Sequence, residues 1–128
     1  MSLDRAARVI NGGMIAFDLA LGAGALAAPD RTLRLLGHEP PSPDARALFR
    51  RCGPIWLTFA AAHAVARARG ERRDWWALAW LRGTEIATDA VWASASPSIT
   101  RPGARAALWA AGAGNLAMAL GFGRLARR

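Results

Sequence analysis

The chain has 128 residues, which is enough for one domain and too few for two. Hydrophobic residues make up 53% of the chain and charged residues 20%, and the formal net charge is +8. A basic chain can bind nucleic acid, but these arginines flank apolar runs instead of forming one basic stripe. We therefore expect no nucleic-acid partner. The single cysteine, Cys52, excludes an internal disulfide.

Long apolar runs occupy most of the sequence. Residues 106–123 carry no charge, residues 52–66 contain His63 as their only basic group, and residues 9–29 contain Asp18 as their only charge. A bilayer span needs about 20 mostly apolar residues, and in lipid each span must satisfy its own backbone hydrogen bonds. We therefore predict an all-α, integral membrane four-helix bundle that forms one domain over residues 1–128. The predicted helices lie near 6–28, 47–67, 75–94 and 104–124.

Two other interpretations of these runs are weaker. A soluble four-helix bundle needs polar outer stripes, and the fourth run has none. A cleaved signal peptide would suit Arg5 and Arg8 ahead of an apolar run, with the small residues "ALAA" at 25–28. Against cleavage, Asp18 interrupts this run, which is also long for a signal peptide. Three apolar runs would remain after cleavage.

The first connection is the longest. Residues 30–36, followed by Gly37, are predicted to form a short amphipathic helical segment, with Leu33, Leu35 and Leu36 on the bilayer surface. The stretch "EPPSP" then runs extended, because each proline disfavours helix in its predecessor. This connection is either a spacer or a cap over an opening between helices.

Arginine placement predicts the orientation. Four arginines crowd the short second connection, on the side that also holds both termini: Arg67, Arg69, Arg72 and Arg73. Cytoplasmic loops carry an excess of such residues. We therefore predict a multi-pass protein of the bacterial inner membrane with both termini in the cytoplasm.

The third predicted helix carries three charges on one face. Arg82, Glu85 and Asp89 follow the spacing i, i+3, i+7 and lie between Trp75 and Trp92. A charge at the bilayer centre costs roughly 2.5 to 3.5 kcal/mol even on the mildest scale. The stripe must therefore face the bundle interior or a wet cavity.

The other predicted helices offer polar residues to meet this stripe. Asn11 and Asp18 share a face of the first helix, and Trp56 and His63 share a face of the second. Trp109 and Asn115 are assigned to one face of the fourth. If these faces converge, six polar side chains surround one centre: Asp18, His63, Arg82, Glu85, Asp89 and Asn115.

The charges at this centre do not balance. Three acids, one arginine and a neutral histidine leave an acidic excess, which protons, a charged His63 or a bound cation could offset. We expect Glu85 and Asp89 to titrate as a coupled pair, with Arg82 holding one as carboxylate while the other keeps its proton. Such a pair can act as general acid and base.

The candidate site residues follow from this arrangement. The candidate catalytic residues are Asp89, Glu85, Asp18, Arg82 and His63. The candidate substrate-binding residues are Asn115, Asn11, Trp56, Trp92 and Trp109. The alternatives are a structural ion network for the charged residues, hydrogen bonds between helices for the asparagines, and core packing for the tryptophans. Neither a metal nor a cofactor is expected, because metal-ligand spacings and phosphate-binding loops do not occur in the sequence.

About half of the chain carries a family resemblance. Residues 8–66 combine an apolar first helix ending in "AP", a short "LRLLG" segment, and Arg51 and Gly53 at the opening of the second helix. This pattern resembles small bacterial four-helix membrane proteins of the broad DoxX-like grouping. The resemblance implies the fold and assigns no catalytic residue. The chain also resembles small multidrug-resistance transporters in its size and in the acid of its first helix. The three charges of the third helix depart from the pattern of those transporters.

Three functions from different classes fit the sequence. The first is a membrane-embedded enzyme that isomerises, cyclises or opens an epoxide of a small apolar or lipid-like molecule by acid/base chemistry. The second is a transporter or binder of amphipathic cations. The third is a non-catalytic accessory subunit. Membrane lipid is an expected partner, and a homo-oligomer is possible because four short helices bury little interior.

Overall fold

The structure is a computed structural model that describes residues 2–39 and 41–128. These residues form an all-α protein with five helices: α1 (Leu3–Ala27), α2 (Pro29–Leu35), α3 (Pro43–Arg69), α4 (Arg72–Ala95) and α5 (Pro102–Ala126). The four predicted long helices are confirmed, with bounds that shift by a few residues. The short segment after the first helix is also confirmed as α2, and Gly37 follows it with φ 95°.

The helix ends follow from their cap residues. Ser2 accepts a hydrogen bond from the Arg5 amide at 3.3 Å, and Ser42 accepts one from the Ala45 amide at 3.1 Å. Each serine thereby satisfies a free N–H group at the start of its helix. Gly70 ends α3 with φ 67°, a left-handed conformation that glycine adopts without strain.

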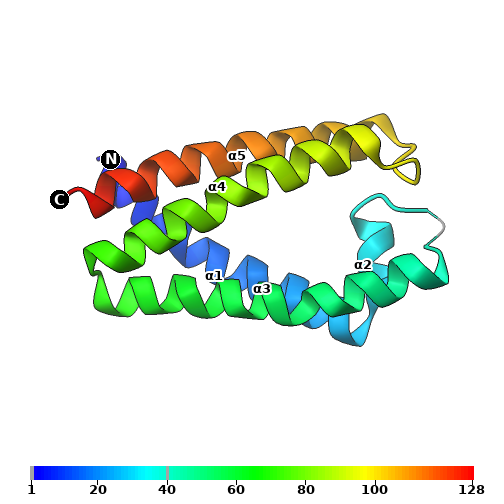
Figure 1. The fold of residues 1–128 in the computed structure, drawn as a ribbon, viewed down its shortest axis with the longest axis horizontal. Coiled ribbons are helices and arrows are strands. Elements are labelled where there is room, and N and C mark those ends of the chain that lie inside the picture. The colour runs from blue at the N-terminus through cyan, green and yellow to red at the C-terminus, as the bar shows by residue number, and fades with distance from the viewer. Residues whose placement is uncertain (1, 40) are drawn as a thin grey trace.

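The long helices form two antiparallel pairs (Figure 1). α1 packs along α3, and α4 packs along α5, with smaller contacts between the pairs. The two pairs come together at the end that holds both termini and the α3–α4 turn. At the opposite end, α2 and the loop after it lie between the pairs, and His38 forms an isolated antiparallel bridge with Ile99.

The α2 segment is more deeply buried than the sequence predicts. Leu33 is 2% exposed and packs against Ala25 and Phe49, whereas Leu35 remains exposed. The prediction that Leu33 lies on a bilayer surface with Leu35 is therefore wrong. The reason is that α2 folds back between the two helix pairs, so one of its sides joins the core.

Apolar side chains cover much of the exterior of the bundle. Exposed large hydrophobic residues occur on every long helix and include Val9, Phe17, Ile55, Trp80 and Leu120. Among the described residues, α1 and α5 are the helices that are long and apolar enough to cross a membrane.

Candidate functional site

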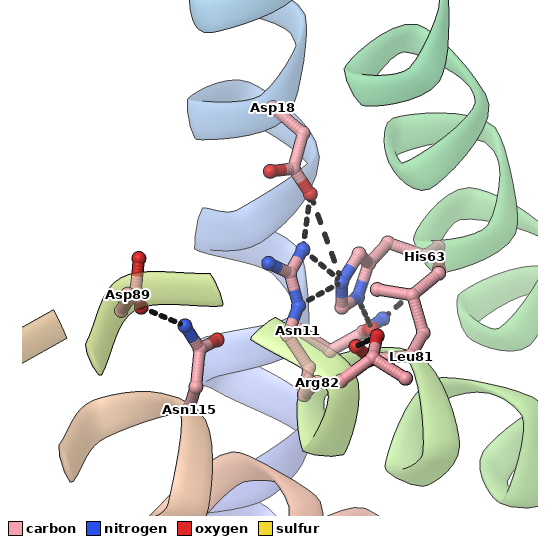
Figure 2. A network of polar contacts seen from close by, with 8 residues as sticks. Asn11, Asp18, His63, Leu81, Arg82, Asp89 and Asn115 are labelled. Carbon is pink, nitrogen blue, oxygen red and sulfur yellow. Dashed lines mark hydrogen bonds and ion pairs between the residues drawn. The ribbon is translucent and has the colours of Figure 1, made fainter. Parts of the chain in front are cut away.

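Arg82 of α4 is the centre of a buried polar network (Figure 2). Its Nε donates a hydrogen bond to Nε2 of His63 on α3 at 3.0 Å, and its Nη2 forms an ion pair with Oδ2 of Asp18 on α1. Arg82 is 3% exposed and Asp18 is 1% exposed. A buried charge needs such a partner because the protein interior replaces its hydration poorly.

His63 holds this network in one hydrogen-bonding arrangement. Because Nε2 accepts from Arg82, the ring is neutral and carries its proton on Nδ1. Nδ1 then donates to Oδ1 of Asn11 on α1 at 2.5 Å. The side-chain amide of Asn11 in turn donates to the main-chain carbonyl of His63 at 3.0 Å. Two side chains of α1, one of α3 and one of α4 are thereby locked together.

The prediction of which residue pairs with Arg82 is wrong. The sequence predicts that Arg82 holds Glu85 or Asp89 as carboxylate, but the guanidinium reaches across the bundle to Asp18 and His63. The i+3 and i+7 spacing brings side chains to one helix face without aiming them at one another. The single predicted centre is in fact two clusters, because Asp89 pairs with α5 instead.

The second cluster joins α4 to α5. The side-chain amide of Asn115 donates to Oδ2 of Asp89 at 2.8 Å, and both residues are buried. Gly112, one turn before Asn115, also faces Asp89, and a Cβ there would lie in ordinary van der Waals contact, 3.6 Å from the Asp89 Cβ. In the described part of the chain, no cation contacts the Asp89 carboxylate.

Glu85 lies between the two clusters along α4. It is half-buried, one turn from Arg82 and one turn from Asp89. Within residues 2–39 and 41–128, its carboxyl group forms neither an ion pair nor a hydrogen bond. Glu85 and Asp89 are therefore two neighbouring carboxyls without a cationic partner, while the charge of Arg82 is already matched by Asp18.

An open hollow of about 670 Å³ lies along the second half of α4. It is lined mostly by small and apolar side chains of that helix: Ala87, Thr88, Val91, Trp92, Ala95 and Ser96. Its dimensions and apolar lining suit a small apolar molecule.

The three candidate binding tryptophans have different surroundings. Trp92 lines the hollow, and its Nε1 donates to Nε2 of His38. Trp56 instead packs on Phe49, with ring centroids 5.2 Å apart. Trp109 is 52% exposed on α5, away from the face that carries Asn115. Each i+3 step falls about 60° short of a full helical turn, so two such steps separate these two residues by about 120°.

His38 is a site residue that sequence reasoning missed. It is buried against Trp92 with ring centroids 5.0 Å apart, although it lies in a loop 54 residues away. Helical periodicity does not extend into loops, so no spacing in the sequence marks His38 as a partner of α4.

The described residues include no group of three or more His, Cys, Asp or Glu side chains placed to hold a metal ion. The chain matches no protein-family model, no characterised protein and no solved structure. The resemblance to the DoxX-like grouping therefore stays an expectation, and an assignment of function depends on the geometry of the two clusters.

Proposed function

We propose that all four long helices cross a membrane as one bundle. The support is an inverted distribution of polarity: Asn11, Asp18 and His63 are buried, whereas large apolar side chains such as Trp80 face outward. Soluble proteins rarely expose such continuous apolar surface, and membrane proteins keep their ionisable side chains inside. The charges that lower the hydropathy of α4, Arg82 and Asp89, are buried against other helices.

The proposed location is the bacterial inner membrane, with both termini in the cytoplasm. The α3–α4 turn lies at the same end of the bundle as the two termini (Figure 1). This turn is rich in arginine, which favours the cytoplasmic side.

The proposed function is that of a membrane-embedded enzyme that uses buried carboxyls as general acid and base. The observation that supports it is the pair Glu85 and Asp89, which has no cationic partner in the described chain and lies on the same helix as the apolar hollow. Two carboxyls one turn apart repel as a dianion, so one of them keeps a proton. A neutral acid beside a carboxylate can donate one proton and accept another.

Each site residue has a proposed role. Asp89 is the carboxylate, because the Asn115 amide donates to it and stabilises its charge. Glu85 is the acid that gives its proton to the substrate, and Asp89 accepts a proton from the substrate or from water. Arg82, Asp18, His63 and Asn11 form the network that fixes the helix positions, so they are positioning residues.

The proposed substrate is a small apolar or lipid-like molecule. The hollow along α4 is open to the outside of the bundle and lined mostly by apolar side chains, of which Trp92 is the largest. Isomerisation, cyclisation or epoxide opening of such a molecule needs a proton added at one atom and removed at another. The pair of carboxyls supplies both transfers and is regenerated when they exchange their proton.

Binding of an amphipathic cation is the second candidate function. The same absence of a cationic partner for Glu85 and Asp89 favours it, because a hydrophobic cation in the hollow would balance their charge. Trp92 would offer a ring face to such a ligand.

Product analysis tests the enzymatic proposal. The purified protein is incubated with an apolar-solvent extract of bacterial membranes, and mass spectrometry follows the compounds consumed and formed. We expect wild-type protein to convert one compound into an isomer or a hydrate. Glu85→Gln and Asp89→Asn should each slow this conversion at least about a hundredfold, the usual range for a lost acid or base.

The controls separate the two candidates. Asp44→Asn removes an exposed acid at the start of α3 and should leave the conversion unchanged. Binding of tetraphenylphosphonium is measured on the same proteins. If no compound is converted but this cation binds and Glu85→Gln abolishes the binding, the second candidate replaces the first. If neither occurs, both proposals are wrong.

A further inference from the structure

A second pocket lies at the end of the bundle where the termini meet. Its volume is about 320 Å³, and it is lined by residues of α1, α3 and α4: Arg5, Arg8, Val9, Asn11, Arg67 and Trp75. It is separate from the hollow along α4 and from the acids Glu85 and Asp89. Its lining contains three arginines and no acidic residue.

The three arginines of this pocket carry uncompensated charge. In the described chain, no carboxylate pairs with Arg5, Arg8 or Arg67. Nearby arginines differ, because Arg69 pairs with Glu71 at 3.0 Å and Arg124 pairs with Asp4 at 3.1 Å. The carboxylates at this end of the bundle are therefore taken by arginines outside the pocket.

Two of these arginines are positioned by the surfaces beside them. The Arg8 guanidinium lies over the Trp75 ring, with Cζ 5.2 Å from the ring centroid. Arg67 lies against α1 at Gly12, where any Cβ would collide with its guanidinium. Such contacts limit the motion of long side chains and keep their N–H groups available for a ligand.

Trp75 supplies an independent sign of a missing acceptor. Its side chain is 2% exposed, and its Nε1–H has no hydrogen-bond acceptor among the described residues. Buried donors are almost always paired, so an unpaired one beside a pocket points to a group that accepts its hydrogen bond.

We propose that this pocket binds a phosphate group, carried either by an anionic lipid headgroup or by a soluble molecule. Phosphate offers several acceptor oxygens and one negative charge as a lipid diester, or up to two as a monoester, which suits several guanidiniums and an indole N–H. A single carboxylate would satisfy one arginine in bidentate geometry and leave the others unmatched. A basic pocket at the end of a helix bundle also lies at the depth of lipid headgroups.

Arg31 and Arg50, which also lack a carboxylate partner in the described chain, form a poorer site. Arg31 and Arg50 line an open pocket of about 610 Å³ near α2, but Asp30 lies in its lining and would repel an anion. No acid enters the lining of the pocket around Arg8 and Arg67. Arg31 and Arg50 therefore provide a control with the same change in net charge at the opposite end of the bundle.

Isothermal titration calorimetry on the purified chain tests the proposal. The probes are inorganic phosphate, glycerol 3-phosphate, and micelles that contain phosphatidylglycerol or, for comparison, phosphatidylcholine. We expect the variant Arg8→Gln/Arg67→Gln to bind at least about tenfold more weakly than wild type, since two charge-assisted contacts are lost. Arg31→Gln/Arg50→Gln should bind within about twofold of wild type, as expected for residues outside the site.

Each outcome has a defined meaning. Binding of phosphatidylglycerol alone identifies a lipid headgroup as the source of the phosphate, and binding of the soluble phosphates alone identifies a soluble ligand. Trp75→Phe keeps the ring beneath Arg8 and should weaken binding several-fold, because only the N–H donor is removed. Equal losses in both arginine double variants, or no binding by wild type, would overturn the proposal whatever the fate of the acidic pair.

Discussion

Arg82 connects three helices because its guanidinium is both a charge partner and a hydrogen-bond donor. Asp18 neutralises the charge, and His63 accepts a hydrogen bond from Arg82 while its own Nδ1–H donates one to Asn11. The same contacts leave Glu85 and Asp89 without a cation. The interior therefore separates one compensated set of polar residues, which holds the helices, from two acids without a cationic partner in the described chain.

The pair of Arg82 and Asp18 predicts strong coupling in stability measurements. Arg82→Met or Asp18→Asn alone should destabilise the fold by about 3–5 kcal/mol, because each leaves one buried group without its partner. The double variant should lose clearly less than the sum of the two losses. Chemical unfolding in detergent measures all four proteins. Additive losses would contradict the pairing.

The sequence predicts which residues lie inside but not which of them touch. The seven-residue spacing of Arg82 and Asp89 places both on the same helix face, and both are buried in the structure. The partner of Arg82 depends on the rotation and depth of α1 and α3 relative to α4, which a single sequence does not encode in its spacing. Trp109 shows the same limit within one helix, because successive i+3 steps drift around the axis.

At the scale of elements, α1 and α3 cross closely at two glycines. A Cβ at Gly22 would lie 2.9 Å from the main-chain oxygen of Gly53, and a Cβ at Gly53 would lie 3.1 Å from that of Gly22. Both contacts are with backbone, which cannot rotate away. Small residues of this kind allow helices to pack closely in lipid.

Gly22→Ala should therefore destabilise the bundle by about 1–3 kcal/mol, because the helices must separate to admit the methyl group. Gly83→Ala is the matched control, since a Cβ at Gly83 meets no atom within 4 Å. This control should be neutral or stabilising by up to about 1 kcal/mol, because alanine favours helix over glycine. Unfolding midpoints of the two variants distinguish the cases, and equal effects would refute a close crossing at Gly22.

The loop after α2 is held to α4 by a neutral histidine. The Trp92 Nε1–H donates to Nε2 of His38, and the Glu39 amide donates to the Ser98 carbonyl at 3.4 Å beside it. Arg101 and Glu39 form an exposed ion pair at the same contact. These contacts favour the interpretation of the first connection as a cap between the helix pairs over that of a plain spacer.

Acid should loosen this cap. Burial lowers the pKa of His38 below its ordinary value of 6.5, so the unfolded chain binds more protons between the lowered pKa and 6.5. The stability contributed by neutral His38 is complete above 6.5 and is lost as the pH falls through this window. Hydrogen exchange of the Glu39 amide, corrected for its intrinsic rate, should lose protection as the pH falls below 6.5. His38→Gln should remove this dependence, and a pH-independent wild type would contradict the prediction.

Helix existence and loop contacts differ in how far the sequence predicts them. The four long helices follow from apolar runs with clear ends, and α2 follows from its amphipathic pattern and Gly37. The burial of Leu33 and the contact of His38 with Trp92 depend on how α2 enters the space between the helix pairs. That placement is a tertiary event, so local patterns of residues do not contain it.

For the whole molecule, large apolar side chains are exposed and polar side chains are buried more than in a typical soluble bundle. Apolar side chains face outward on all four long helices, while a buried ion pair and five other buried polar residues lie within, beside the apolar core. The exposed arginines lie mainly at the two ends of the bundle, beyond the apolar middle. This arrangement supports the proposal that the bundle lies in lipid, where apolar side chains can face outward and ionisable side chains stay inside.

The whole-molecule prediction is a four-span topology with both termini in the cytoplasm. In bacterial cells, the chain should stay in the membrane pellet after alkaline carbonate extraction. Green fluorescent protein fused at either terminus should fluoresce, whereas alkaline phosphatase fused there should be inactive, because the first folds in the cytoplasm and the second outside it. Alkaline phosphatase inserted after Ser98, in the α4–α5 connection, should be active. Release by carbonate would contradict the membrane proposal, and an active phosphatase at one terminus would contradict an even number of spans.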